Sequence, residues 1–386
     1  MDALVTAMIP RALTQIPDCR RNNKRHKLLD LLVIAFFAIL AGADGWVAVA
    51  EYGRRKKSWL RTFLDLPHGI PSHDTFNELF SRLDPEPFEK CFMEWISQMV
   101  QISNGRLIAI DGKSLRHSFE HGWDKSGMAH IVSAFLSANH MVFAQVKTEG
   151  KGHELCGVEK LLEILDLRGA IVTLDALGCN RRIAELVILN QGDYILQVKK
   201  NQEALLQKLQ GTMDEAILLN FKGMEHDCFV SEVEADHGRI EQRKVWVTWD
   251  LSGLGALAGE WKGLKCLIVV ECTCTRSNGE GVPQTTLTRH YYISSINRRH
   301  SAKRIAACIR GHWGVENNLH WQLDVSFNED QRRLRVGHGA ENFSRLCRMA
   351  LNLLKHETTA KCGIANKRKI CGWDNDYLLK VLQAIS

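Results

Sequence analysis

The chain has 386 residues, of which 45% are hydrophobic, so it can bury a large core and divide into two or three domains or subdomains. Fifty Lys and Arg against 44 Asp and Glu give a formal charge of +6. The clustering of the basic residues favours a polyanionic partner, although a modest net charge also serves solubility. This composition excludes a disordered chain, and the twelve cysteines show no CxxC spacing, so we interpret them as reduced thiols of a cytoplasmic protein.

The amino-terminal region contains one strongly apolar segment, Leu28 to Ala41. It includes Asp30 and is shorter than the roughly 20 residues needed to span a bilayer. The residues before it lack the basic start, apolar block and cleavage site of a signal peptide. We therefore predict a buried core helix and neither secretion nor a membrane segment.

Residues 1–100 are predicted to be helical, with two basic clusters, Arg20 to Lys27 and Arg54 to Lys57. Cationic stretches on both sides of a helical hairpin suit contact with DNA phosphates, and a solvated helix surface is the alternative. Further helices are expected from Ser72 onward and over Phe88 to Val100.

From residue 106 the pattern changes to alternating strands and helices. The expected order is three strands, a helix, a strand, a helix and a strand, which predicts a mixed α/β sheet with an antiparallel meander followed by parallel crossovers. The strands are Leu107 to Ile110, Ala129 to Ser137, Met141 to Lys147, Ala170 to Leu174 and Tyr194 to Lys199, and the helices are Glu154 to Leu165 and Arg181 to Asn190.

Residues 222–296 are interpreted as a β-rich insertion. Its expected strands are Val245 to Trp249, Cys266 to Cys274 and His290 to Ser294. Helices resume over Ser301 to Arg310, from Trp313 onward and over Glu341 to Lys355, before a short basic tail that contains tryptophan.

Two of the predicted strands are followed by an aspartate, Asp111 after the first and Asp175 after the fourth. Asp is unfavourable in strands and costly to bury alone, so each carboxylate is expected either to cap a turn or to hold a cation. If the strands are neighbours, the two carboxylates repel each other unless a cation lies between them, and Mg²⁺ or Mn²⁺ suits such an oxygen site.

The best candidate for a third acidic group lies in residues 310–324, RGHWGVENNLHWQLD. On one helix, His312, Glu316, His320 and Asp324 lie at four-residue intervals and form a polar stripe. This stripe is either a hydrogen-bonded or solvated helix face or part of a metal site. Zinc is the less favoured metal, because no further His/Cys pair is evident.

The motifs that occur in order along the chain are AIDGKSLRHS, HIVSAF, QVKTEGK, LLEILDLRGAIVTLDALGC, GDYILQVKKNQ, RHYYISS, RGHWGVENNLHWQLDVSFNED and ENFSRLCRMALNLLK. In this combination the chain resembles the H-repeat-associated family of bacterial insertion-sequence transposases. GADGW and LPHGIPSHDTF also resemble that family's associated helical domain, so the resemblance covers nearly the whole chain.

The resemblance implies a DDE transposase with a ribonuclease-H-like core, whose acidic triad is Asp111, Asp175 and Glu316 and binds two Mg²⁺ or Mn²⁺ ions. It implies cleavage of double-stranded DNA at insertion-sequence ends, transfer of those ends to target DNA, a homodimer on DNA, and a cytoplasmic, nucleoid-associated location. The expected domains are a helical DNA-binding or associated domain (1–100), the first part of the catalytic core (101–221), the β-rich insertion (222–296), and the helical completion of the core with the tail (297–386).

The residues expected to contact DNA are Lys113, Arg116, Lys199, Arg54, Arg55, Lys56 and Lys57. For Lys113, a surface salt bridge is the alternative. His312 and His320 are accessory candidates that orient Glu316 or touch DNA, and Asp324 is either an accessory ligand or part of a salt bridge on the helix face.

The chain departs from the wider group of related transposases near Glu316, where Ile309, His312 and Leu323 replace a Tyr, an Arg and a Lys. Trp313 and Trp321 are expected to pack rather than to stack on bases. Two other functions stay open: a decayed or repurposed transposase that binds DNA without cutting it, and a ribonuclease-H-like nuclease that cuts without strand transfer.

Overall fold

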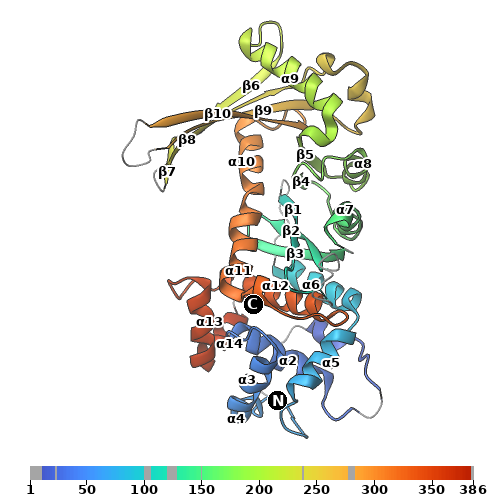
Figure 1. Cartoon of the computed structure of the whole chain (residues 1–386), viewed down its shortest axis with the longest axis vertical. Helices are drawn as coiled ribbons and strands as arrows, with labels where there is room; N and C mark the ends of the chain where they lie inside the picture. The colour runs from blue at the N-terminus through green and yellow to red at the C-terminus, as the bar shows by residue number, and fades with distance from the viewer. Residues whose placement is uncertain are drawn as a thin grey trace. The chain divides into compact units, whose positions relative to one another are not determined.

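The computed structural model describes residues 11–21, 24–99, 106–119, 128–148, 150–236, 239–276 and 283–383 (Figure 1). Residues 1–10, considered above for a signal peptide, and Val100, the predicted end of a helix, lie outside the described residues. The chain forms two compact units. Unit 1 comprises Met1–Ile102, Gly112–Gly157 and Val315–Ser386, and unit 2 comprises Ser103–Asp111 and Val158–Gly314.

Unit 1 is mainly helical, as predicted for the amino-terminal region. The segment predicted as a basic tail folds into two helices, α13 and α14. The helices of unit 1 are η1 Arg11–Gln15, α2 Leu28–Leu40, α3 Trp46–Arg55, α4 Lys57–Leu60, α5 His73–Arg82, α6 Pro85–Met99, η3 Lys151–His153, η6 Glu316–His320, α11 Trp321–Phe327, η7 Glu329–Gln331, α12 Gly339–His356, α13 Ile364–Trp373 and α14 Asn375–Gln383.

Helix α2 confirms the prediction of a buried core helix, because every residue from Asp30 to Leu40 is buried. The predicted start of α5 is also confirmed, since the hydroxyl of Ser72 accepts a hydrogen bond from the backbone N–H of Thr75 at 3.3 Å. Among the described residues, no helix combines the length and the apolar character needed to cross a bilayer.

The strands of unit 1 are the end of β1 (Leu107–Ser114), β2 (His130–Leu136) and β3 (Met141–Thr148), in the order β3-β2-β1. β2 and β3 pair antiparallel through the turn at residues 137–140, as the sequence predicted. β3 is the outer strand of the sheet, so one row of its backbone groups needs partners other than a strand.

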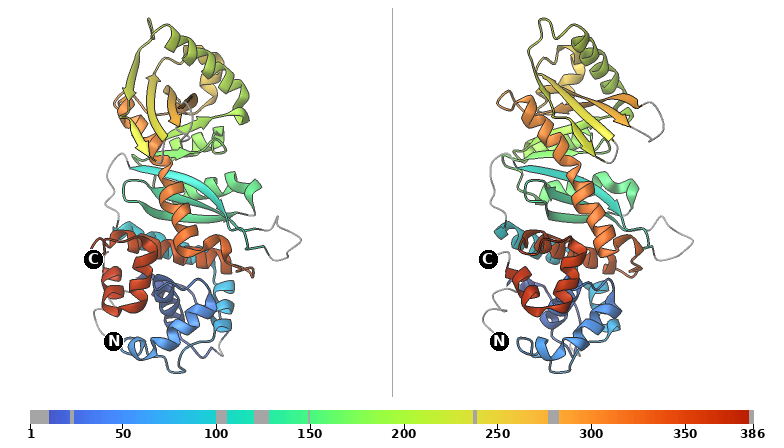
Figure 2. Two further views of the ribbon diagram at one scale, coloured as in Figure 1. Left: turned by 60° about the vertical axis from the view of Figure 1, so that its left-hand side comes forward. Right: turned by 90° about the vertical axis from the view of Figure 1, so that its left-hand side faces the viewer.

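Helix α12 supplies partners for β3, because it packs against this strand (Figure 2). The same helix also contacts α2, α5, α6 and α13. The side-chain amide of Asn352 accepts from the N–H of Val142 at 2.9 Å and donates to its carbonyl at 2.8 Å. Glu89 of α6 accepts from the N–H of Gln145 at 2.7 Å and pairs with Arg345 at 2.6 Å. Polar residues are therefore buried on α12 because they satisfy a strand edge.

A second arginine of α12, Arg348, forms a fully buried ion pair with Glu329 at 3.0 Å. Ser344 donates to the same carboxylate at 2.8 Å. Burial would raise the pKa of Glu329, but the charges of Arg348, Arg332 and Lys113 outweigh burial and lower it. The pair joins η7 to α12 in the ionised state.

The GADGW segment joins the amino-terminal helices to the carboxy-terminal ones within unit 1. Asp44 pairs with Arg368 of α13 at 3.1 Å and accepts from the side-chain amide of Asn328 at 2.7 Å. Arg368 also donates to the carbonyl of Ile39 at the end of α2. This family-like motif thus acts as a structural connector.

Unit 2 holds the larger part of the sheet, in the order β1-β4-β5-β10-β9-β8-β6, with β7 paired to β8. β1, β4 and β5 are parallel, which confirms the predicted crossovers, and the other pairs are antiparallel. The elements of unit 2 are β4 Ile171–Leu174, α8 Arg181–Leu189, β5 Asp193–Val198, η4 Lys200–Gln202, α9 Glu203–Leu218, β6 His226–Val230, β7 Glu234–Asp236, β8 Arg239–Thr248, η5 Ser252–Glu260, β9 Cys266–Arg276, β10 Gln284–Ser294 and α10 Ala302–His312, with α7 Glu154–Ile164 beginning in unit 1.

The predicted β-rich insertion is strand-rich, and it extends the central sheet. β10 pairs antiparallel with β5, with Tyr291 opposite Val198. Helix α10 packs on β4, β6 and β8, where Ile305, Cys308 and Ile309 join one apolar cluster with strand residues. Helix α9, which precedes the insertion, was missed from the sequence.

The Arg348–Glu329 pair gives a test of the unit 1 core. Replacing Arg348 with Met leaves a buried carboxylate without its cation, so we expect the free energy of unfolding in urea to fall by about 3–5 kcal/mol. Adding Glu329→Gln should recover part of this loss. The same Met substitution at exposed Arg333 should change stability little; an equal loss there would contradict the argument.

Candidate active site

Asp111 and Asp175 lie at neighbouring positions on two parallel strands. The register of β1 and β4 pairs Ile110 with Leu174, so each aspartate is the next residue along its strand. Adjacent strands are about 4.8 Å apart. The predicted end of the first strand is corrected, because β1 continues through Asp111 to Ser114, whereas β4 does end before Asp175.

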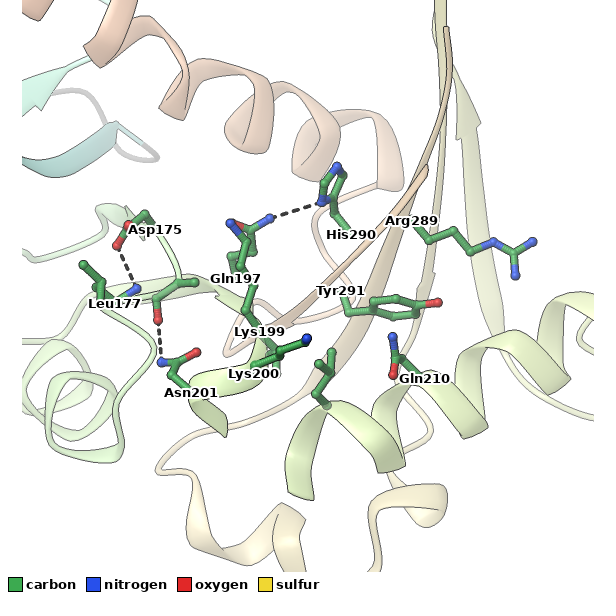
Figure 3. Close-up of a pocket in the computed structure, with 13 residues that line it drawn as sticks. Asp175, Leu177, Gln197, Lys199, Lys200, Asn201, Gln210, Arg289, His290 and Tyr291 are labelled. Carbon is green, nitrogen blue, oxygen red and sulfur yellow. Dashed lines mark hydrogen bonds between the residues drawn. The ribbon is translucent and has the colours of Figure 1, made fainter. Parts of the chain in front are cut away.

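The Asp175 carboxylate caps the turn after β4 while lying beside Asp111. It accepts hydrogen bonds from the backbone N–H groups of Leu177 at 2.9 Å and Gly178 at 3.2 Å. The side-chain amide of Asn201 donates to the carbonyl of Ala176 at 2.7 Å and holds the next loop against this turn (Figure 3). The capping and cation-holding alternatives are therefore compatible at this residue.

Gly112 was interpreted as a turn residue, but it lies within β1. A Cβ atom there would come within 2.4 Å of both Glu154 Oε1 and His130 Nε2. His130 is buried, with Nε2 3.3 Å from Glu154 and Nδ1 3.0 Å from the Ser114 hydroxyl. Glycine leaves room here for the buried His130 and the half-buried Glu154, whose side chains approach the strand closely.

Lys113 forms ion pairs with two carboxylates. Its ammonium group is largely buried, 2.7 Å from Asp324 and 3.4 Å from Asp330. The salt-bridge alternative is the one observed, for Lys113 and for Asp324 alike. Arg116 pairs with Asp330 at 3.0 Å but keeps an exposed side chain.

The segment 302–327 is not one regular helix, so the predicted single polar stripe is wrong. α10 ends at His312, a π-helical turn covers Glu316–His320, and α11 begins at Trp321. Glu316, at the start of the π-helical turn, is exposed. π-Helical turns occur often at functional sites.

The two histidines of the supposed stripe have different surroundings. In unit 2, His312 Nδ1 lies 3.1 Å from the Thr173 hydroxyl, and burial lowers the pKa of His312 while nearby Asp175 opposes this. In unit 1, burial lowers the pKa of His320 to about 3, assisted by the charges of Arg348 and Lys113. Both histidines are neutral at pH 7.

Trp313 and Trp321 contradict the prediction that they pack, since they are 53% and 54% exposed. By contrast, Ile309 and Leu323 are buried core residues. Hydrophobic periodicity identified the core side of this segment but could not tell which tryptophans are covered.

The other predicted DNA contacts are distributed over both units. Arg54 and Arg55 are exposed and pair with Glu51 at 2.8 and 2.6 Å. Lys56 donates to Asn375 at 2.7 Å, and Lys57 is half-buried.

Lys199, in unit 2, is exposed at a pocket of about 600 Å³ that also contains Asp175. Two neighbouring residues of its lining, Gln197 and His290, lie 3.4 Å apart from Nε2 to Nδ1 (Figure 3). Tyr291 donates to Asp214 at 2.8 Å, and burial together with this bond raises its pKa to about 12. Sequence reasoning missed these lining residues, although RHYYISS was one of the motifs it used.

Asp111 and Asp175 supply two carboxylates of the kind that Mg²⁺ and Mn²⁺ prefer. Within the parts of the chain that the structure describes, no group of three or more His, Cys, Asp or Glu side chains is placed to hold a metal ion. The adjacent pair fits part of a divalent-ion site and needs further ligands.

Gly112 provides a test of the close approach to β1. Gly112→Ala should lower the free energy of unfolding by about 1–3 kcal/mol, because the added methyl group overpacks against His130 and Glu154. The matched change Gly211→Ala, on helix α9 with open space around its Cβ position, should be neutral or slightly stabilising. Equal effects of the two changes would contradict the packing explanation.

His320 provides a pH test. Its folded pKa of about 3 lies below the ordinary value of 6.5, so the unfolded chain takes up a proton first and stability falls as pH drops from 6.5 toward 3. This group alone should lower the free energy of unfolding by about 1 kcal/mol between pH 6.5 and 5.5. Urea titrations of His320→Gln should lack this component, while exposed His153→Gln should retain it.

Comparisons with known proteins agree with the motif order. The family model described as "Transposase DDE domain" matches residues 102–353, and the one described as "DDE_Tnp_1-associated" matches residues 11–96. "Putative transposase YncI" of Escherichia coli O157:H7 is 39% identical over 97% of this chain and 94% of its own length. "H repeat-associated putative transposase YhhI" of Escherichia coli K12 is 36% identical over 95% of each chain.

A solved piggyBac transposase synaptic complex with hairpin DNA is 12% identical over 97% of this chain and 78% of that chain, and its TM-score of 0.40 is too low to support an argument. The chain belongs to the transposases with a DDE domain, among the H-repeat-associated members of that family.

Proposed function

We propose that this chain cuts DNA at the ends of an insertion sequence and joins those ends to target DNA, with Asp111, Asp175 and Glu316 as its catalytic acids. The observation that carries the proposal is the parallel register of β1 and β4, which brings the first two acids to neighbouring positions. Two neighbouring carboxylates repel each other, and a cation bound between them relieves that repulsion.

The order and direction of the strands support a ribonuclease-H-like core. The sheet order β3-β2-β1-β4-β5 combines an antiparallel hairpin with three parallel strands, and the aspartates follow corresponding positions of two central strands. This arrangement is the one that the family resemblance implies for the catalytic part of the chain.

Glu316 is proposed as the third acid because the family resemblance gives it that role and because it starts the π-helical turn Glu316–His320. The exposed carboxylate of Glu316 is also accessible to a ligand.

We propose that the three acids hold two Mg²⁺ or Mn²⁺ ions. Such ions activate water or a DNA 3′-hydroxyl group and stabilise the charge on the leaving oxygen. The chain itself fixes the Asp175 carboxylate with two backbone N–H groups and borders it with the neutral imidazole of His312.

Double-stranded DNA is the proposed partner, bound by two copies of the chain on paired ends. Arg116, Lys199 and Arg55 have exposed side chains suited to phosphate contact. Residues 1–100 are the proposed DNA-binding or associated domain. Chromosomal DNA as substrate places the proposed activity in the cytoplasm with the nucleoid.

A cleavage and joining assay tests the proposal. The full chain is incubated with Mg²⁺ and a DNA fragment that carries its gene with the native flanking sequence, together with a second plasmid as target. Asp111→Ala and Asp175→Ala should each reduce cleavage and joining by at least about 100-fold and leave DNA binding largely intact. Asp166→Ala, an exposed partner of Arg168 in the same unit, is the matched control and should keep full activity.

The assay also separates the alternatives. Cleavage without joined products would identify a nuclease that lacks strand transfer. Binding without cleavage by the unmodified chain would identify a DNA-binding protein that has lost catalysis. Full activity of Asp111→Ala would refute the assignment of the acids.

A further inference from the structure

The outer ends of β8, β9 and β10 form a ribbon in unit 2, here called the arm (residues 239–244, 271–276 and 284–289), with β7 along β8 (Figures 1 and 2). On β10, residues 284–288 are all exposed, and Leu287 is 58% exposed. β5 pairs with β10 only from Tyr291 to Ser294. Within the described residues, the β10 edge beyond Tyr291 therefore has no strand beside it.

The hydrogen bonds that β10 forms with β5 and β9 show which of its backbone N–H and C=O groups point to the open edge. The N–H of Ser295 donates to the carbonyl of Tyr194 on the β5 side, whereas the carbonyl of Ser294 accepts from Lys265 on the β9 side. Successive residues of an antiparallel strand alternate in this direction, and the β9–β10 register is unbroken. Thr285 and Leu287 consequently present their backbone N–H and C=O groups to the open edge.

The chemistry of the arm argues against a DNA partner. Residues 230–244, 271–276 and 283–289 together contain five Lys and Arg and five Asp and Glu, so the arm and the β7 segment have no net charge. Arg243 pairs with Glu234 at 3.0 Å, and Arg289 pairs with Glu271 at 2.8 Å. A neutral surface with an exposed Leu offers a polyanion little attraction.

The edge sequence is complementary to itself. If two copies pair antiparallel about Thr286, Thr285 of each copy lies opposite Leu287 of the other and Thr286 lies opposite itself. All four edge groups that point outward then exchange N–H···O=C bonds, and no like charges face each other. Pro283, which has no N–H, limits the edge on one side.

We propose that the open edge of β10 binds the same edge of a second copy of this chain, forming a two-fold dimer through a continuous sheet. This contact deepens the two-copy arrangement of the proposed function by naming its surface. An edge of about five residues is small compared with the roughly 1,200 Å² of a stable interface, so the dimer is weak in solution.

Sedimentation velocity of the full chain without DNA, from about 1 to 100 µM, tests the proposal. The average mass of the unmodified chain should rise with concentration from 43.7 kDa toward twice that value. Thr285→Pro removes an outward N–H without touching the bonds to β9, and Leu287→Lys places a charge on the edge. Each should weaken association at least tenfold.

Ile240→Lys is the matched control, since Ile240 is an exposed apolar residue on β8, with β9 between it and β10. It should associate like the unmodified chain, and circular dichroism should show all variants folded. A chain that stays monomeric, or association that both edge variants retain, would overturn the proposal. Loss of DNA binding by Thr285→Pro with unchanged mass would assign the arm to DNA instead.

Asp111→Ala keeps this test separate from the proposed catalysis. It should associate like the unmodified chain even if it cuts no DNA, because Asp111 is not part of the arm. If the assignment of the catalytic acids is wrong, the masses measured by sedimentation velocity stay the same. If the edge contact is wrong, the cleavage and joining assay still tests the catalytic acids independently.

Discussion

The backbone edge of β3 must be satisfied without a neighbouring strand, and the core of unit 1 is built around that requirement. Asn352 and Glu89 bond to this edge, and Arg345 compensates the charge that Glu89 brings into the interior. Arg348 and Glu329 then form the next buried pair along α12. Each of these charges is acceptable only because its partner is present, since a buried ion without its counterion costs several kcal/mol. Unit 1 therefore combines an apolar core with a strict polar network.

Polar and charged side chains beside β1 are also fixed by partners within unit 1. Gly112 leaves room for His130 and Glu154, and Lys113 is held by Asp324 and Asp330. The strand that carries Asp111 is thereby tied down just beyond the aspartate by contacts in unit 1. Lys113, which the sequence assigned to DNA, helps here to fix the backbone, and a rigid backbone is what a site of adjacent carboxylates requires.

Much of the fold could be predicted because hydrophobic periodicity is local. The apolar helix α2, the β2–β3 hairpin and the alternation that leads to parallel strands all follow from runs of a few residues. The predictions that were wrong depend on distant contacts. The first strand continued past Asp111, a π-helical turn interrupted the predicted polar stripe from His312 to Asp324, and the two tryptophans were not covered. Backbone continuation and burial depend on neighbours that no local window contains.

The sequence by itself determined the family, the strand and helix order, and the two aspartates that follow β-branched runs, since these depend on residue types and spacing. Only the tertiary structure decided that Asp111 and Asp175 are adjacent, because register is a property of two strands 64 residues apart. It also decided that Lys113 is an internal counterion and that β10 has an open edge. Charge pairing and strand pairing are long-range interactions, so they appear only when the chain is folded.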